Sequence, residues 1–501
     1  MKTKYDHTHI QETGDATGIL PVPSGEPVKV FGTEAIRRTF DSLCIQQALN
    51  TQSSPGVAHT VLNPDAHCGY GAPVGCVLAS PSHVYPGPVG VDIKCSMSYL
   101  QLDLPESEVA GKEVRRQLIN AITNRTPTGA GKHQRSVPKD RHTTPDQGFR
   151  IATEGATPEN CGALGVPPEW AEHCEDSFHV GHDGSKDALA NRLEFLQTQK
   201  PGMKLDEKLT QLGTYGSGNH FGECEVTRIH QDHRSLEAAK VFGLKDGHVG
   251  FLSHCGSRGF GYQLANNQFK TMEQHFEANS IPLPAGDRQL VYAELGTQLA
   301  DDYIDDMSLG GNFSTLNHLL INALILEAFQ EVFPGVKGEL AYFISHNIAR
   351  KETLADGEHW VHRKGATRAF PAGHAALAQT KYAQTGHPIL LPGNPQAGSA
   401  IMVADEGAEA SCYSINHGAG RIRSRRAAKR ELDQGQVDQS FDEADILTNC
   451  RRYPLDEAPA AYKDFNDVLR SVEDAGLASE VARLEARFVI KDEDKSNGGA
   501  A

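Results

Sequence analysis

The octapeptide Ser414-Ile415-Asn416-His417-Gly418-Ala419-Gly420-Arg421 joins a strand-like run that begins at Cys412 to a basic helix expected over residues 422–430. It places one imidazole directly before a Gly-Ala-Gly turn. Glycine lets a backbone approach a phosphate closely and turn its N–H groups toward it. Four interpretations of His417 are open at this point: a metal ligand, a general acid or base, a nucleophile toward phosphorus, or a residue that caps the following helix.

Strand-like apolar runs also precede four other side chains of types that bind metals, namely Asp92, Cys95, His254 and His346. His220 instead follows a Gly-rich loop, Leu212-Gly-Thr-Tyr-Gly-Ser-Gly. Ligands collect where strands end and loops begin, because the scaffold there fixes the backbone and leaves side chains free. The pattern therefore predicts that these side chains belong to one site.

The residue types favour a metal centre. Asp92 and Cys95 are three residues apart and can face one ion around a tight turn, and a thiolate can bridge two ions. None of the ten cysteines forms a CxxC pair, so the spacing of structural zinc sites is missing. Asp65 and His67 form a further acid/base pair. Metals beside Gly-rich anion loops indicate an enzyme that acts on phosphate, with its nucleophile undetermined.

Composition limits the partners and the compartment. The 501 residues carry a formal net charge of −16, so a nucleic-acid partner needs a local basic stripe, such as residues 421–430 or the group Arg363, Lys364 and Arg368. The scattered cysteines favour a reducing compartment, and the N-terminus has no apolar signal core. The longest apolar helical segment, residues 316–333, is interrupted by polar residues and falls short of a membrane span. We expect a cytoplasmic protein without a membrane partner.

The chain is expected to divide into a polar N-terminal segment (1–26), a catalytic domain (27–491) and a polar, disordered tail (492–501). Within the domain, residues 126–200 are dense in Gly, Pro and charged residues and are interpreted as an elaborated surface region. It includes Gly129-Ala-Gly-Lys132, a candidate for phosphate binding that lacks the full P-loop spacing. Helices are expected over 34–49 and 315–333, and strands over 28–31, 59–62 and 89–95.

Seven motifs, taken together, resemble those of RtcB-type RNA ligases, in the same order along the chain. They are Asn63-Pro-Asp-Ala-His-Cys-Gly69, Gly90-Val-Asp-Ile-Lys-Cys95, Leu212-Gly-Thr-Tyr-Gly-Ser-Gly-Asn-His-Phe221, His254-Cys-Gly-Ser-Arg-Gly259, Ser345-His-Asn-Ile-Ala-Arg350, Val361-His-Arg-Lys-Gly-Ala-Thr-Arg-Ala-Phe-Pro371 and His417-Gly-Ala-Gly-Arg421. The resemblance spans roughly residues 27–491. It implies an α+β fold with central curved β-sheets surrounded by helices.

The resemblance also implies a cofactor set and a role for each matching residue. Two Mn²⁺ ions would share the Cys95 thiolate, the first also bound by Asp92 and His220 and the second by His254 and His346. His417 would take GMP from GTP as the nucleophile, and Asp65 would act on protons nearby. The expected phosphate contacts are Asn219, Arg258, Asn347, Asn394 and Arg421, and the expected guanine pocket is Glu223, Ser399, Tyr462 and Lys491.

The implied reaction joins an RNA 3′-phosphate or 2′,3′-cyclic phosphate end to a 5′-OH end through an RNA-3′-pp-5′-G intermediate. An archease-type activator is a candidate partner. Two departures from the family pattern bear on this expectation. Residues 392–399 read Pro-Gly-Asn-Pro-Gln-Ala-Gly-Ser, where the family has Pro-Gly-Ser-Met-Gly-Thr-Ala-Ser, and Ser96 replaces a glycine beside Cys95. They leave two alternatives: a dinuclear metallophosphohydrolase acting on RNA ends without nucleotidyl transfer, or a noncatalytic RNA-end or ribosome-associated binding factor.

Overall fold

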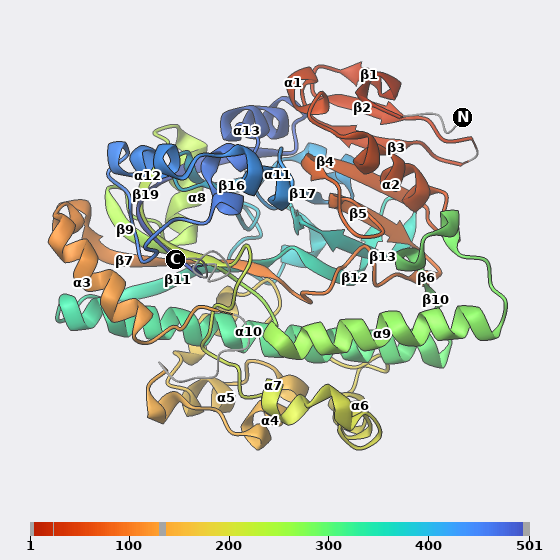
Figure 1. The fold of residues 1–501 in the computed structure, drawn as a ribbon, viewed down its shortest axis with the longest axis horizontal. Helices are drawn as coiled ribbons and strands as arrows, with labels where there is room; N and C mark the ends of the chain where they lie inside the picture. Colours follow the sequence, from red (N-terminus) through yellow and green to blue (C-terminus); the bar gives the residue numbers. More distant parts are fainter. Residues whose placement is uncertain (1–4, 24, 130–136, 494–501) are drawn as a thin grey trace.

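The computed structural model describes residues 5–23, 25–129 and 137–493 (Figure 1). The proposed phosphate loop at 129–132 and the end of the expected tail therefore lie largely outside the described residues. The fold is α+β, with two large curved sheets and helices packed around them. Among the described residues, no helix is long and apolar enough to cross a membrane.

The first large sheet has seven strands and includes part of the expected N-terminal segment. In spatial order they are β1 (Gln11–Gly14), β2 (Thr17–Leu20), β3 (Val28–Phe31), β4 (His59–His67), β5 (Val74–Ser80), β13 (Gly357–Lys364) and β12 (Asn347–Leu354). Strand β3 was predicted with these bounds. Strand β4 runs on to His67 through an irregular register, although the sequence suggested an end at Leu62.

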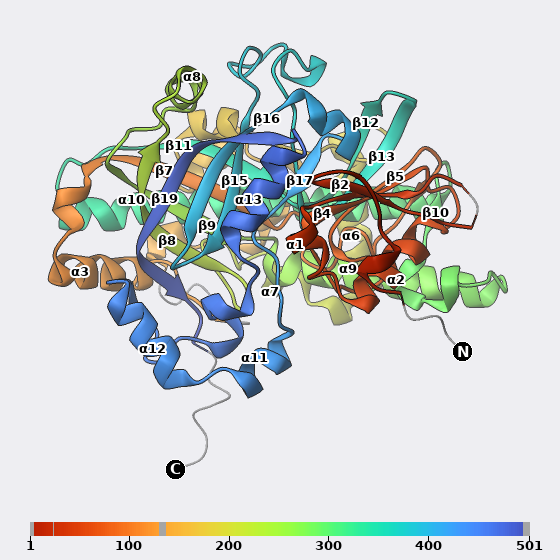
Figure 2. The same cartoon turned by 90° about the horizontal axis from the view of Figure 1, so that it is seen from above.

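The second large sheet has eight strands. Its order is β11 (Gly338–Ser345), β7 (Ser96–Pro105), β9 (His248–Cys255), β8 (Phe221–Ile229), β19 (Ala478–Lys491), β16 (Gly398–Ala404) and β15 (Pro388–Asn394), and β18 (Leu447–Thr448) pairs with β19. In Figure 2 the long strand β19 curves along this sheet. Two short pairs complete the strands: β6 (His83–Val84) with β10 (Ala293–Glu294), and β14 (Ala366–Arg368) with β17 (Ser414–Asn416).

The helices cover the sheets and one another. They are α1 (Glu34–Arg37), α2 (Ser42–Gln52), α3 (Lys112–Thr123), α4 (Pro145–Glu154), α5 (Pro158–Ala163), α6 (Lys186–Gln199), α7 (Leu205–Lys208), α8 (His233–Phe242), α9 (Arg258–Ala278), α10 (Gln298–Val332), α11 (Arg425–Glu431), α12 (Gln434–Glu443) and α13 (Phe465–Asp474). Helices α9 and α10 run beneath the sheets in Figure 1, and α4 to α7 lie on their far side. The described part of 126–200 thus packs as helices against α10.

Three expected elements differ from the structure. The helix predicted over 34–49 is split into α1 and α2, because Asp41 caps a new helix by accepting hydrogen bonds from the N–H groups of Leu43 and Cys44. Helix α10 begins at Gln298, well before the predicted start. Residues 89–95 form turns instead of a strand, and Lys94 there has a φ of +52°. Asp92 and Cys95 therefore precede strand β7 and do not follow a strand.

Candidate metal centre and active site

The strand order β11-β7-β9-β8 brings the predicted metal ligands together. Ser96 at the start of β7 pairs with Ser345 at the end of β11, and Phe221 at the start of β8 pairs with His254 of β9. Cys95, His220 and His346 are the immediate chain neighbours of these paired residues, and Asp92 lies three residues before Cys95. All of them therefore meet at one end of the sheet.

Five side chains form two potential metal-binding groups that share one thiol. Asp92, Cys95 and His220 make up the first group, and Cys95, His254 and His346 the second. In the first group, Nε2 of His220 lies 2.8 Å from Oδ2 of Asp92 and 3.4 Å from Sγ of Cys95. In the second, Nε2 of His254 lies 3.1 Å from Sγ of Cys95 and 3.0 Å from Nε2 of His346. The geometry fits two ions bridged by the thiolate.

A carbonyl oxygen near Nδ1 orients each of the three imidazoles. Nδ1 of His220 lies 2.7 Å from the carbonyl oxygen of Tyr215, and Nδ1 of His254 lies 3.0 Å from the carbonyl oxygen of Asn219. Nδ1 of His346 lies 3.2 Å from the side-chain Oδ1 of Asn347. Because Nδ1 is engaged by these oxygens, each Nε2 faces the centre; His254 and His346 present neutral nitrogens there, whereas the Nε2 of His220 is bonded to the Asp92 carboxylate. This outer-shell pattern is typical of histidines that bind metals.

The charges of the site also suit cations. Burial and the neighbouring imidazoles lower the pKa values of His254 and His346, which keeps both rings in the neutral form that binds a metal. Burial raises the pKa of Asp92, but the charge of His220 outweighs it and lowers the pKa to about 2. Burial, followed by the charge of Asp92, raises the pKa of the Cys95 thiol. A bound cation would reverse that preference by stabilising the thiolate.

His417 lies next to this centre without belonging to either group. Its ring centroid is 4.6 Å from that of His346. Nδ1 of His417 lies 2.7 Å from Oδ2 of the fully buried Asp65 and 2.9 Å from the carbonyl of Gly365. Gly420, with a φ of +73°, permits this approach, since a Cβ there would lie 2.2 Å from the carbonyl oxygen of Asp65. With Nδ1 engaged, Nε2 is the ring nitrogen left for chemistry.

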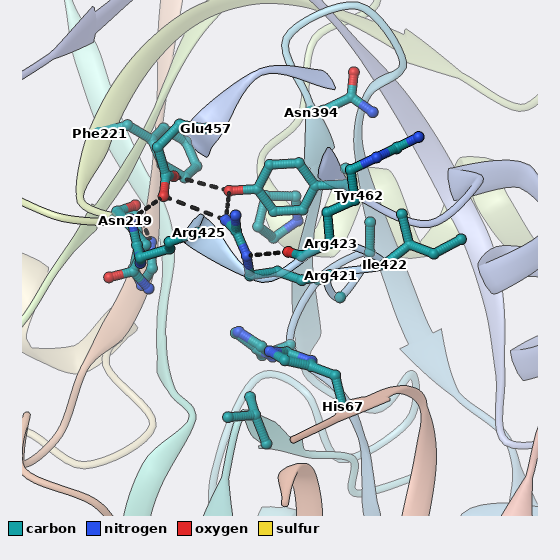
Figure 3. A pocket seen from close by; sticks show the side chains of 18 of the residues that line it. His67, Asn219, Phe221, Asn394, Arg421, Ile422, Arg423, Arg425, Glu457 and Tyr462 are labelled. Atoms are coloured by element: carbon teal, nitrogen blue, oxygen red, sulfur yellow. Dashed lines mark hydrogen bonds and ion pairs between the residues drawn. The ribbon is translucent and has the colours of Figure 1, made fainter. Parts of the chain in front are cut away.

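A cavity of about 640 Å³ opens beside His417. Figure 3 shows Tyr462, Arg421 and Glu457 together in it, with His67 below them in that view. Six of the residues predicted to contact nucleotide line the cavity: Asn219, Glu223, Asn394, Arg421, Tyr462 and Lys491. Burial raises the pKa of Glu223 to about 7.

The other three predicted nucleotide contacts lie outside the cavity lining. Asn347 and Arg258 are beside the metal groups: Nδ2 of Asn347 donates to the carbonyl of Asp92, and Nε of Arg258 donates to Oγ1 of Thr214. Ser399 is fully buried in β16, where its hydroxyl donates to Oε1 of Glu225 at 2.8 Å. The structure thus separates Ser399 from the cavity and connects it to Glu225 of β8, the strand that also carries Glu223.

Glu457 is a cavity residue that the sequence did not single out. Its carboxylate is 3.0 Å from Nζ of Lys491, 2.8 Å from the Tyr462 hydroxyl, 3.4 Å from Nη1 of Arg421 and 2.5 Å from Nη1 of Arg425. Burial raises its pKa, but the charges of Lys491 and the arginines outweigh burial and lower the pKa to about 2. The only signal in the sequence is its place five residues before Tyr462.

Comparison with known proteins identifies the family. The family described as tRNA-splicing ligase RtcB matches residues 47–492. The chain belongs to the RtcB family. It is 33% identical over 490 residues to the tRNA-splicing ligase RtcB of Pyrobaculum aerophilum, covering 93% of this chain and 94% of that protein. It is 32% identical to the proteins of the same name from Thermococcus kodakarensis, covering 93% and 94%, and Methanococcus maripaludis, covering 96% and 99%.

The two departures from the RtcB pattern have defined structures. Residues 392–399 form the β15–β16 hairpin, where Oδ1 of Asn394 accepts hydrogen bonds from the N–H groups of Gln396 and Ala397. Asn394 therefore closes its own turn at the cavity wall. The hydroxyl of Ser96 donates to the carbonyl of Lys94. Neither change removes a candidate ligand or His417.

Proposed function

We propose that this RtcB-family protein is a GTP- and Mn²⁺-dependent RNA ligase that joins RNA 3′-phosphate or 2′,3′-cyclic phosphate ends to 5′-OH ends. The observation that carries the proposal is the orientation of His417. Its Nδ1 is held by Asp65 and Gly365, and it stands beside two potential metal groups at the wall of a cavity. The names of the relatives, all tRNA-splicing ligases, support the same reaction class.

His417 is the nucleophile in the first step. A neutral imidazole whose Nδ1–H donates to Asp65 carries its lone pair on Nε2. Nε2 attacks the α-phosphorus of GTP, the N–P bond forms, and the P–O bond to pyrophosphate breaks. The Asp65 carboxylate, 2.7 Å from Nδ1, stabilises the positive charge that develops on the ring.

Cationic groups around His417 compensate the phosphate charge. Two Mn²⁺ ions, held by Asp92, Cys95 and His220 and by Cys95, His254 and His346, would neutralise charge on the reacting phosphate oxygens. Arg421 and Asn219 line the same cavity and contribute hydrogen-bond donors to those oxygens.

Guanine recognition is assigned to three other residues that line the cavity. The Glu223 carboxylate accepts hydrogen bonds from the base, and the Tyr462 ring and Lys491 line the same cavity. Lys491 is paired with Glu457 at 3.0 Å, which fixes its position before the base enters. Ser399 acts through Glu225 in this arrangement, because its hydroxyl is bonded to that side chain.

The later steps return the histidine to its starting state. An RNA 3′-phosphate oxygen attacks the phosphorus of His417-GMP, the N–P bond breaks, and RNA-3′-pp-5′-G forms. The 5′-OH of the second RNA end then attacks the 3′-phosphorus, which forms the phosphodiester and releases GMP. A 2′,3′-cyclic phosphate is first hydrolysed to the 3′-phosphate at the same site.

Labelling tests the first step directly. Incubation of the protein with Mn²⁺ and GTP labelled at the α-phosphate is expected to give an acid-labile protein adduct. His417→Ala should abolish the adduct, and His275→Ala, at an exposed position of α9, should not. Absence of a His417-dependent adduct would overturn nucleotidyl transfer, and hydrolysis of RNA phosphate ends without GTP would then favour the metallophosphohydrolase.

A further inference from the structure

A third group of metal-competent side chains lies away from the centre at Cys95. His59, Asp356 and His359 place one potential ligand atom each within 4.8 Å of the others. Nε2 of His59 lies 2.8 Å from Oδ2 of Asp356, and Nε2 of His359 lies 3.5 Å from the same oxygen. His59 begins β4, so at the usual rise per residue the group lies about 20 Å along that strand from Asp65.

The sheet register gives the two histidines a common face. His59 of β4 and Val361 of β13 both pair with Ala79 of the intervening strand β5. Directly paired residues share a face, and side chains alternate along a strand, so His359 lies on the same face as Val361 and hence as His59. The turn between β12 and β13 then brings Asp356 to both imidazoles. The chelating arrangement thus follows from the backbone.

The orientation of His359 resembles that of the histidines at the Cys95 centre. Its Nδ1 lies 3.1 Å from the carbonyl of Gly357, so Nδ1–H donates there and the Nε2 lone pair faces Asp356. The His359 side chain is only 4% exposed, whereas the Asp356 side chain is 50% exposed. The group therefore has a buried ligand, His359, on one side and a solvent-exposed ligand, Asp356, on the other.

An adjoining cavity adds a second observation. His59 and Asp356 line a cavity of about 690 Å³ that is also lined by Gln52. The Gln52 side chain is buried, its amide nitrogen donates to the carbonyl of Ala58, and its Oε1 has no partner among the described residues. A buried acceptor without a partner calls for a water or ligand donor nearby. The cavity itself gives water access to the fourth position of an ion held by His59 and Asp356.

We propose that His59, Asp356 and His359 bind one Zn²⁺ ion, separate from the metals at Cys95, with water in the fourth position. Two imidazoles and a carboxylate with one open position form a tetrahedral zinc set. A site with two nitrogen donors and a single carboxylate suits zinc better than Mn²⁺ or Mg²⁺, which prefer oxygen ligands. Asp356 is the only charged donor, so the bound ion keeps part of its positive charge.

The ion would fasten the two strands that hold His417. Strand β4 carries Asp65, and β13 leads directly into Gly365; these residues supply both partners of the His417 Nδ1. Zinc at the opposite ends of β4 and β13 would clamp them across β5. This role is independent of GTP, and the site stands whether or not His417 is guanylylated.

Metal stoichiometry tests the proposal. The full chain is stripped with chelator, dialysed against Zn²⁺ and analysed for bound metal. Because the thiol and imidazoles of the Cys95 centre are also suitable zinc ligands, the informative quantity is a difference in bound zinc. His59→Asn and Asp356→Asn should each bind one equivalent less than wild type, and His275→Asn should bind the same amount. Circular dichroism checks that each variant is folded. If all four proteins bound the same number of zinc equivalents, His59, Asp356 and His359 would form only a surface ion pair and the proposed zinc site would be wrong.

A second measurement uses the unaltered chain. Diethyl pyrocarbonate modifies accessible, unligated imidazoles, and mass spectrometry locates the modified histidines. Zn²⁺ should protect His59 at least tenfold while the exposed His275 continues to react. Reaction of His59 at the same rate with and without Zn²⁺ would contradict the proposal even if neither variant folded.

Discussion

At the scale of single residues, Asp65 is the side chain on which His417 most depends. Its Oδ2 is 2.7 Å from the His417 Nδ1, and it is fully buried. Asp65→Asn keeps the volume but offers an amide that can present N–H to Nδ1 and favour the wrong tautomer. The initial rate of GMP adduct formation is expected to fall about 10²- to 10⁴-fold.

Quench-flow labelling with α-phosphate-labelled GTP measures this rate. Asp187→Asn, an exposed carboxylate at the start of α6, is the matched control and should react like wild type. An Asp65→Asn protein that forms the adduct at the wild-type rate would show that Asp65 does not assist His417.

Glu457 governs a pH-dependent part of the stability. Its pKa falls from 4.5 to about 2 on folding, because Lys491 and the arginines outweigh the burial that opposes ionisation. A depressed carboxyl pKa stabilises the folded state above the unfolded value, and this stabilisation is lost as the pH falls from about 4.5 through about 2. Glu457→Gln leaves the cations uncompensated and should cost about 3–5 kcal/mol at neutral pH.

Urea unfolding of both proteins across this pH range tests the prediction. The difference between wild type and Glu457→Gln should shrink as the solution is acidified. Glu431→Gln, at an exposed pair with Arg430, should show a far smaller difference at every pH. If wild type and Glu457→Gln differed in unfolding free energy by the same amount at every pH, the charge of Glu457 would not be what stabilises its contacts with Lys491 and the arginines.

Residue types predicted the five ligand candidates and His417 even where the local structure was predicted wrongly, as at Asp92 and Cys95, because histidine, cysteine and aspartate carry distinctive chemistry. All five enter the two groups, and Asp65 contacts His417. The role of Glu457 was not predictable, since an acidic residue in a polar stretch is ordinary until its cationic and hydroxyl partners are placed around it. The burial of Ser399 was not predictable either, because it depends on the pairing of β16 with β19.

At the scale of elements, the turn that carries Asp92 and Cys95 is tied to α10 by Lys94. The buried ammonium donates to the Asp176 carbonyl at 2.9 Å and to Oγ1 of Thr315 at 2.7 Å, and it lies 2.8 Å from Nε2 of His179. Lys94→Met should keep the apolar stem but remove these bonds, loosening the turn. Mn²⁺ affinity is expected to fall about 10- to 100-fold.

Equilibrium dialysis with Mn²⁺ gives the affinity, and Lys270→Met on the exposed face of α9 is the control. Both variants are compared by thermal unfolding as well. If the Lys94→Met protein unfolded at a lower temperature but kept its Mn²⁺ affinity, Lys94 would stabilise the fold without positioning the metal ligands.

The elements themselves were predictable where one local signal dominates. Val28–Phe31 is a strand as expected. The strand predicted over 89–95 was wrong. The alternating apolar residues there lie in a turn, which is fixed by a hydrogen bond from the Lys94 N–H to the Asn347 carbonyl. The early start of α10 was missed since Gly310 and Gly311 suggest a break, yet both let the helix pack closely against Ile93 and His179.

For the whole molecule, the sheet order was not accessible from local pattern. Strands β7, β9, β8 and β11 are neighbours although long segments separate them in sequence. Their register depends on packing that forms only on folding, so the sequence predicted that the ligands share a site and left open how they meet. The same topology places β4 and β13 on either side of β5 and thereby creates the third cluster.

Net charge leads to a prediction for RNA binding. The chain carries −16 overall, so the long-range field repels RNA, and affinity must come from local basic groups. Arg421 to Arg425 line the cavity and lead into α11, where Arg426 and Arg430 are exposed. Arg426→Gln with Arg430→Gln should weaken binding of a single-stranded RNA and reduce the slope of log affinity against log salt by about 1.4, because each arginine that neutralises a phosphate contributes about 0.7.

Fluorescence anisotropy with an RNA carrying a 3′-phosphate, over a series of KCl concentrations, measures the slope. The matched control removes the same charge elsewhere: Arg38→Gln with Arg470→Gln, two arginines 63% exposed at the end of α1 and on α13, should leave the slope unchanged. GMP adduct formation should survive in both double variants, because GTP binds inside the cavity. If the two double variants had equal slopes of log affinity against log salt, the α11 arginines would act only through the net charge of the chain. RNA would then approach His417 over another face.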